Sequence, residues 1–600
     1  MMKLRLLVLL FAMVWTALIG RVYYLSVQQS SHYEKLALRN TVKTEPLLPV
    51  RGTIYDRNGH PLAVNRLGFS ISLTPHLSHR SDQRELDEVL AFIAQVFPDL
   101  EKSETLKERY AKLDSFYSHD PVELVPFVPY ESILPYFTRL SLHPHVNIAP
   151  TTLRHYPNGN VASHVLGYVS RADRRDAQID ATSRTIGFYG RAGVERFYNE
   201  ALQGELGSRT YQVTAFNREI EEIERIEPSQ RQDMVLHLDI RLQRHVHELF
   251  NSQGKSGVAL VMELETGGLL AAGSYPEYDN NKFVTGISAD EWKAMIEDFN
   301  HPFINKMANS LYPPGSVIKP TVGLAFMESG LMNPSSEFNC NGAFPFGGRD
   351  FRCWKKEGHG DVNLRKSIRE SCDVYYYRGS HLVGIDALSK KLSEHGFGVK
   401  TGIDLPNEFV GIVPSREWKM ERYNKRWFTG ETLITSIGQG SFLSTPLQAL
   451  TNTSLLASGR LMSPRLVKSV RDEPVPAEWT EPFSDSDRYY IDEVRKGMDD
   501  VAQAPHGTAL RAFSYVPVRV AGKTGTAQVI SIPQDEKERM SESELEYRSR
   551  SHAWFIGYAP SNKPRYAVTV LVEHGMSGGG VAAPVAAQIF RKMHDLGYFK

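Results

Sequence analysis

The sequence is poor in cysteine, in excess charge and in long hydrophobic runs. Its 600 residues include only three cysteines. An odd number leaves one unpaired, and a chain long enough to bury a large core is not expected to rely on a disulfide framework. Lys plus Arg and Asp plus Glu balance at 69 each, so no long-range field draws the chain to nucleic acid, and we exclude nucleic-acid binding.

One apolar segment near the start has the character of a membrane anchor. Lys3 and Arg5 precede the run 6–20, and Arg21 is followed by 22–25, whose aromatic residues suit a membrane interface. The run is short against the roughly 20 residues of a full span, so Arg21 would extend toward the outer interface. A cleaved signal peptide is the alternative, but no small-x-small cleavage site follows. We expect an uncleaved single-pass anchor, with the bulk of the chain exported.

Ser316 and Lys319 form a Ser-x-x-Lys pair at the start of an apolar helical segment. A serine hydroxyl is a weak nucleophile and needs a neighbouring base, and a lysine three residues on lies on the same helical face. The preceding Tyr-Pro-Pro-Gly at 312–315 cannot continue a helix, which places Ser316 in the first turn, where the helix dipole favours negative charge. Alone, the pair is a weak signal because it arises often by chance.

Two further motifs strengthen this interpretation: Ser-Cys-Asp at 371–373 and Lys-Thr-Gly-Thr at 523–526. Ser371 alone would be interpreted as a helix N-cap. In order and spacing, however, the three motifs resemble the active site of serine penicillin-recognising enzymes. Asp373 takes the position where that superfamily usually has asparagine, a form that elongation-type penicillin-binding protein 2 often shows. The substitution removes the amide from this position.

Other strings extend the resemblance over nearly the whole chain. Similarity to the pedestal domain of class B penicillin-binding proteins lies at 51–59, 154–157, 163–168 and 190–195. Similarity to elongation-type penicillin-binding protein 2 lies at 401–406, 414–419, 437–440 and 445–448. We interpret the charged residues of the pedestal strings as ion pairs that stabilise turns, and the Asp-Arg-Asn-Gly string within 51–65 predicts a hairpin.

The resemblance and the element pattern predict an α+β protein in three parts. These are a cytoplasmic tip and membrane anchor at 1–25, an extended mixed pedestal of the dimerisation type at 26–228, and a transpeptidase domain at 229–600. Strands are expected at 257–264, 269–274, 553–558 and 566–572, and a closing helix at 582–596. Strands at both ends of one domain imply an antiparallel sheet completed by distant segments. The charge run 535–550 is expected to form a mobile loop beside the site.

The resemblance implies peptidoglycan D,D-transpeptidation in the bacterial periplasm, with the anchor in the inner membrane. A stem peptide ending in D-Ala-D-Ala would acylate Ser316, and a β-lactam would acylate the same serine and remain. Burial of Lys319 would favour the uncharged amine of a general base. Ser371 would pass a proton to the departing amine, and Lys523 would supply positive potential.

Substrate binding is assigned to the rest of the motif residues. The hydroxyls of Thr524 and Thr526 would hold the terminal carboxylate, and Gly525 would avoid crowding the substrate backbone. Asp373 is assigned to the same substrate-binding group. Backbone N–H groups of Ser316 and Thr526 would form an oxyanion hole.

All three cysteines lie in one short window, with a histidine between the last two. Cys340, Cys353, His359 and Cys372 make a Cys3His set suited to tetrahedral Zn²⁺. One disulfide beside a free thiol, and buried inert cysteines, are the alternatives. Some penicillin-binding protein 2 sequences resemble this pattern at Cys353, His359 and Cys372, whereas Cys340 aligns only with a gap, so Asp350 is the alternative fourth ligand. The expected role of one zinc ion is structural, because four protein ligands leave no open position.

Two other functions stay open at this point. The first is the septal penicillin-binding protein, which Asp373 and the Gly-Gln-Gly at 438–440 disfavour. The second is an allosteric partner whose pedestal activates a membrane glycosyltransferase that polymerises lipid II, a role that the resemblance implies beside catalysis. A Ser316→Ala chain that still restored rod shape would favour the partner role.

Overall fold

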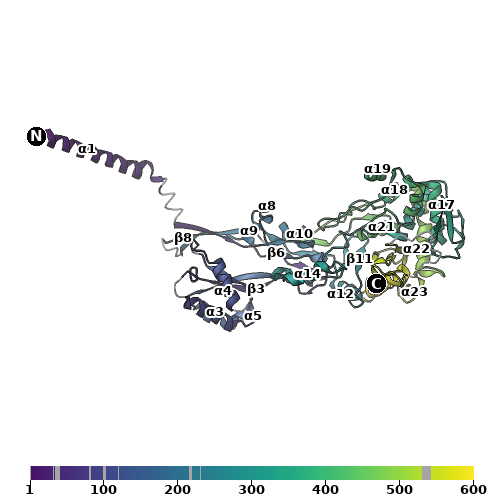
Figure 1. Ribbon diagram of the computed structural model, residues 1–600, viewed down its shortest axis with the longest axis horizontal. Coiled ribbons are helices and arrows are strands. Elements are labelled where there is room, and N and C mark those ends of the chain that lie inside the picture. The colour runs from purple at the N-terminus through teal and green to yellow at the C-terminus, as the bar shows by residue number, and fades with distance from the viewer. Residues whose placement is uncertain are drawn as a thin grey trace. The chain divides into compact units, whose positions relative to one another are not determined.

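The chain folds into two compact units, each built from segments that are distant in sequence. The computed structural model describes residues 2–31, 33, 41–79, 83–98, 103–118, 120–214, 219–229, 232–529 and 542–600 (Figure 1). The first unit comprises Met1–Arg51, Ala172–Phe188 and Gln203–Arg231, and the second comprises Gly52–Arg171, Tyr189–Leu202 and Gln232–Lys600.

The first unit contains the apolar helix and a small antiparallel sheet. Helix α1 (Met2–Tyr23) continues as the π-helical turn η1 (Tyr24–Gln28). The apolar helix Met2–Gln28 has 27 residues, and its most apolar stretch is not buried against other parts of the described protein. It is therefore long enough to cross a bilayer and is compatible with the predicted single-pass anchor. The sheet has the order β1 (Val42–Leu47), β8 (Gly207–Val213) and β9 (Glu219–Ile226).

The second unit begins with the predicted hairpin. Strands β2 (Ile54–Tyr55) and β3 (Pro61–Leu73) pair antiparallel, and the Gly59 N–H donates to the Asp56 carbonyl within the turn. The sheet that contains the hairpin has the order β19, β18, β10, β2, β3, β4, with β5 also paired to β3. Its other strands are β4 (Val122–Pro129), β5 (Val146–His155), β10 (Met234–Leu236), β18 (Val467–Val470) and β19 (Glu473–Pro474). Helices α3 (Arg84–Val96) and α4 (Ser103–Leu113) share one apolar core with β3 and β4.

This part of the unit contains a buried ion pair, between Arg154 and Glu195 rather than the turn-stabilising pairs that the sequence predicted. Arg154 Nε lies 2.7 Å from Glu195 Oε1, and both side chains are buried. The Arg154 guanidinium also donates to the Gly52 carbonyl at 2.8 Å, and Tyr156 donates to the same Glu195 oxygen at 3.2 Å. The ion pair is structural because each buried charge has its partner within the fold.

In the second sheet of this unit, strands from the beginning and from the end of the segment 232–600 lie side by side. Five antiparallel strands have the order β12, β11, β23, β22, β21. They are β11 (Gly257–Glu263), β12 (Leu269–Tyr275), β21 (Ala521–Ala527), β22 (His552–Ala559) and β23 (Tyr566–Val572). Every residue of β22 and β23 is buried, so both faces of the sheet are covered.

Helices cover this sheet, and the first two motifs lie where α15 (Lys319–Glu328) and α17 (Asp373–Val383) begin. Helix α12 (Ile240–Asn251), capped by Asp239, packs with the closing helix α24 (Ala583–Asp595), and the chain ends beside them (Figure 1). The remaining helices include α16 (Leu364–Arg369), α21 (Pro446–Ser458) and α22 (Asp485–Gln503). The predicted α+β class, the four strands and the closing helix are confirmed. The loop predicted at 535–550 lies outside the described residues up to position 541.

Candidate active site

Ser316 lies in the 3-10 turn η3 (Gly315–Ile318), directly before α15. Its side chain is partly exposed, whereas Val317 and Ile318 are buried. The Gly315 N–H donates to the Gly438 carbonyl at 2.9 Å. A Cβ atom at Gly438, whose φ is +75°, would lie 2.2 Å from the Gly315 carbonyl oxygen, so only glycine fits this approach. The turn that presents Ser316 is therefore fixed by the Gly-Gln-Gly string noted in the sequence.

Lys319 is fully buried, and its hydrogen bonds go to the second motif. Its Nζ donates to the Ser371 carbonyl at 2.9 Å and to Asp373 Oδ1 at 2.8 Å, and it lies 3.2 Å from Ser371 Oγ. The Tyr376 ring centroid is 5.1 Å from the same nitrogen. Within the described part of the chain, the lysine therefore bonds Ser371 and Asp373 rather than Ser316, the partner that helical spacing suggested.

Ser371 joins the two lysines of the site. Its φ is +56°, a left-handed conformation that costs about 1 to 2 kcal/mol for a residue with a side chain. Ser371 Oγ lies 2.9 Å from Lys523 Nζ and 3.2 Å from Lys319 Nζ. The Nζ group of each lysine can donate to this oxygen, whether the lysine is charged or neutral. The Ser371 hydroxyl therefore keeps its own proton for another acceptor.

Lys523 is fully buried on β21, where it also donates to the Thr524 carbonyl at 2.8 Å. Burial, together with the charge of Lys319, lowers the pKa of Lys523 well below its usual value. The sequence analysis gave Lys523 the role of a positive charge. The shift instead favours its neutral amine.

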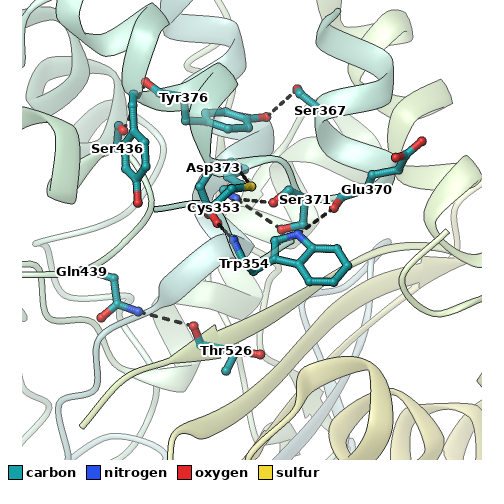
Figure 2. Close-up of polar contacts among 12 residues, drawn as sticks. Cys353, Trp354, Ser367, Glu370, Ser371, Asp373, Tyr376, Ser436, Gln439 and Thr526 are labelled. Carbon is teal, nitrogen blue, oxygen red and sulfur yellow. Dashed lines mark hydrogen bonds and ion pairs between the residues drawn. The ribbon is translucent and has the colours of Figure 1, made fainter. Parts of the chain in front are cut away.

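Asp373 stands at the position of the usual asparagine, and both of its carboxylate oxygens have partners within the chain. Oδ1 accepts from Lys319, and Oδ2 accepts from the backbone N–H of Trp354 at 3.0 Å (Figure 2). A carboxylate accepts hydrogen bonds but does not donate them. Asp373 cannot supply the N–H group that an asparagine would offer a substrate carbonyl.

The three motifs surround one cavity of about 890 Å³. The motif residues that line it are Ser316, Ser371, Asp373, Thr524, Gly525 and Thr526. A Cβ atom at Gly525 would lie 2.9 Å from Val317 Cγ1 and 3.1 Å from Trp554 Cβ. The glycine is therefore required by the packing of β21 itself, a reason that the sequence analysis did not give.

The outer edge of β21 faces this cavity. Gln439 donates to the Thr526 carbonyl at 3.3 Å from outside the sheet (Figure 2). In a strand the N–H and C=O of one residue point to the same side, so the Thr526 N–H also points outward. This orientation suits the predicted oxyanion hole. Gln439 and Thr508, whose hydroxyl lies 2.7 Å from the Thr524 hydroxyl, are site residues that the sequence analysis did not assign.

The cysteine window folds into a compact donor cluster. The ligand atoms of Cys340, Cys353, His359 and Cys372 all lie within 4.8 Å of one another, and all four residues are buried. The three cysteines are free thiols in this structure. Asp350, the alternative fourth ligand, is exposed on β15 (Arg349–Arg352) and is not among the four.

The chemistry of this cluster fits a thiophilic cation. His359 Nδ1 lies 3.6 Å from the sulfurs of Cys340 and Cys353. Hydrogen bonding from Cys372 lowers the pKa of Cys340 to about 4 and that of Cys353 to about 6, while the pKa of Cys372 is raised. Thiolate is the form that binds metal. The residues present therefore match the tetrahedral sulfur and nitrogen donors of a structural zinc site.

The fold and the three motifs around one cavity define a serine penicillin-recognising enzyme. The profile of the Penicillin binding protein transpeptidase domain matches residues 257–591, and that of the Penicillin-binding Protein dimerisation domain matches 46–236. The chain therefore belongs to the penicillin-binding proteins.

Curated relatives that match nearly the whole chain carry the name peptidoglycan D,D-transpeptidase MrdA. The protein of Haemophilus influenzae is 32% identical over 95% of this chain and 88% of its own length. The protein of Escherichia coli K12 is 31% identical over 96% of this chain and 91% of its own length.

Solved structures agree with this assignment. Penicillin-binding protein 2 of Helicobacter pylori, in complex with MreC, is 41% identical, covers 94% of this chain and 100% of its own, and gives a TM-score of 0.84. Penicillin-binding protein 2 of Pseudomonas aeruginosa, in complex with WCK 5153, is 30% identical, covers 91% and 96%, and gives a TM-score of 0.68.

Proposed function

We propose that the protein is a peptidoglycan D,D-transpeptidase that cross-links stem peptides during elongation of the lateral wall. The observation that carries this function is that Ser316 and Ser371 line one cavity, while the buried Lys319 and Lys523 both lie within hydrogen-bond distance of Ser371 Oγ. Relatives named D,D-transpeptidase cover nearly the whole chain, which supports the same activity.

The reaction begins with acylation of Ser316. Its Oγ attacks the carbonyl carbon of the penultimate D-Ala, and Lys319, once uncharged, takes the hydroxyl proton. The N–H groups of Ser316 and Thr526 stabilise the oxyanion, each contributing about 3 to 4 kcal/mol as in comparable sites. The C–N bond then breaks, and terminal D-Ala leaves as an amine that receives its proton from the Ser371 hydroxyl.

Ser371 can serve this step because it contacts both lysines. After it gives up its proton, it is reprotonated by Lys319, which lies 3.2 Å away and received the proton of Ser316. The chain of Lys319, Ser371 and Lys523 thus returns to its starting protonation state. In the second half of the reaction, the amine of a neighbouring stem peptide attacks the acyl carbonyl, and Ser316 regains its proton along the same route in reverse.

The Cys3His cluster would hold one structural Zn²⁺ through Cys340, Cys353, His359 and Cys372. The ion would cross-link the loop that ends in the second motif. It would take no part in the reaction, because four protein ligands fill its coordination sphere. What this chain contributes at the site is the position of Cys372, directly after Ser371. Anchoring Cys372 restrains the backbone that presents the Ser371 hydroxyl.

The anchor and pedestal support a place in a membrane assembly. One apolar helix near the start fits a single-pass anchor in the inner membrane, with the catalytic part in the periplasm. A solved structure titled as a peptidoglycan synthase complex that coordinates polymerisation and cross-linking is 29% identical and has a TM-score of 0.71. A membrane glycosyltransferase that polymerises lipid II is therefore the partner that we propose.

Intact-mass analysis tests the activity directly. The full chain, purified in detergent and incubated with a penicillin, should gain the mass of one drug molecule, and Ser316→Ala should gain none. An unchanged mass in folded protein, or an equal gain in Ser316→Ala, would contradict the assignment. Restoration of rod shape by Ser316→Ala would instead assign the main role to partner activation.

A further inference from the structure

Trp354 lies between the cysteine cluster and the second motif and donates two hydrogen bonds. Its backbone N–H donates to Asp373 Oδ2 at 3.0 Å, and its indole Nε1–H donates to the Glu370 carbonyl at 3.0 Å (Figure 2). The two acceptors flank Ser371 on either side in the sequence. One residue therefore holds both ends of the turn that carries the Ser371 hydroxyl.

This turn needs external support. Helix α16 ends at Arg369 and α17 begins at Asp373, so the segment 370–372 connects two helices without belonging to either. The last carbonyls of a helix lack partners in the helix itself, and the Glu370 carbonyl finds its partner in the indole. Ser371 between them has a φ of +56°, a conformation that persists only where its surroundings enforce it.

The indole ring contributes little to the buried core. Trp354 is 52% exposed and is one of the residues that line the cavity. It packs edge-on against the His359 ring, at a centroid distance of 5.5 Å. Removing a group that is half in solvent costs little core burial, so the loss of its donor can be measured apart from loss of the fold.

We propose that Trp354 is a positioning residue for acylation, acting through the Glu370 carbonyl to keep the Ser371 hydroxyl between Lys319 and Lys523. The inference rests on the proposed transpeptidase function. The indole N–H donates to the turn and not to a catalytic side chain, so its loss should slow bond making after the substrate or drug has bound.

Stopped-flow acylation of the full chain by a chromogenic cephalosporin separates the two stages. Saturation of the observed rate gives the acylation rate constant, and the half-saturating concentration gives the dissociation constant. Trp354→Phe keeps a ring against His359 but lacks the donor, so we expect the rate constant to fall about five- to tenfold, with the dissociation constant within about twofold. Trp479→Phe, a half-exposed tryptophan on β20 (Trp479–Thr480) outside the cavity, is the matched control and should change neither.

A tryptophan analogue of the same shape tests the N–H donor without disturbing the packing of the side chain. Incorporation of benzothienylalanine at position 354 replaces the indole N–H by sulfur with little change of shape, and it should lower the acylation rate constant as Trp354→Phe does. An unchanged rate constant in this protein would overturn the proposal, as would a change confined to the dissociation constant. Failure of the wild-type chain to acylate at all would instead reject the proposed function, which keeps the two outcomes distinct.

Discussion

Lys523 Nζ lies 2.9 Å from Ser371 Oγ although the two residues are 152 positions apart in the chain. Lys319 Nζ approaches the same oxygen to 3.2 Å from a third segment. Ser371, rather than Ser316, is therefore the point where the three motifs are connected by hydrogen bonds. The geometry links the two lysines through one hydroxyl group that can move a proton between them.

Substitution of Lys319 should lower the acylation rate more than substitution of Thr526. Lys319→Ala removes the proposed base together with the partner of Asp373, and we expect no acylation by penicillin. Thr526→Val removes one hydroxyl that would bind a charged carboxylate, a bond of about 1.5 to 3 kcal/mol, so acylation should slow by about ten- to a hundredfold. Stopped-flow rates measure both effects. A full rate in Lys319→Ala would exclude this lysine as the base.

Metal analysis of the isolated protein should find one zinc ion per chain. Structural zinc binding contributes folding free energy, so a strong chelator should lower the melting temperature and slow acylation, and Cys372→Ser should do the same. Asp350→Ala is the control and should retain zinc, because Asp350 lies outside the cluster. Protein isolated without zinc would refute the metal site. Zinc-loaded protein whose acylation ignores the chelator would separate the site from catalysis.

Removing one partner of the Arg154–Glu195 ion pair should destabilise the protein more than removing both charges. Arg154→Met leaves the Glu195 carboxylate buried without its counter-charge, which destabilises proteins by about 3 to 5 kcal/mol. The double variant Arg154→Met, Glu195→Gln removes the charge as well and should recover part of that loss. Thermal unfolding of both proteins measures the difference. Equal melting temperatures for wild type and Arg154→Met would show that the pair contributes nothing.

Asp239 gives a pH-dependent contribution to stability. Burial alone would raise the pKa of its carboxyl, but hydrogen bonds from Arg241 and Tyr598 lower it to about 2, against an ordinary value of 3.8. A lowered carboxyl pKa stabilises the fold above the unfolded value and loses this effect as pH falls through the folded value. Asp239→Asn should cost about 2 kcal/mol at pH 7.

The difference between wild type and Asp239→Asn should shrink as pH falls below about 4. Melting temperatures at pH 7, 5, 4 and 3 follow this change, and Tyr598→Phe, which removes one donor, should show a smaller effect of the same sign. A difference that stays constant across the series would mean that the carboxylate charge is not the source of the stabilisation.

The sequence predicted the sheet of the C-terminal half well because its strands are short apolar runs bounded by turn residues. The segments 257–264 and 566–572 agree with β11 and β23 to within one residue. The closing helix was predicted at 582–596 and is found at Ala583–Asp595. The two-unit arrangement was not predictable, because segments such as Ala172–Phe188 join the first unit through contacts distant in sequence.

The site was predictable where residue type alone carries the chemistry. Motif spacing identified Ser316, Ser371 and the Lys-Thr-Gly-Thr string, and the structure brings them to one cavity. Trp354 and Gln439 were not assigned, because their roles depend on single hydrogen bonds to segments distant in sequence. The bonding of Asp373 by Lys319 and Trp354 was likewise invisible to spacing.

The order of the second sheet ends at β21, and no described strand pairs with its outer edge. A peptide can therefore lie along this edge and leave it sideways, without its end being threaded through a tunnel. Such access matters for a substrate whose other end is joined to a long glycan strand. An edge of this kind would let a stem peptide enter and leave from the side while the glycan strand that carries it stays continuous.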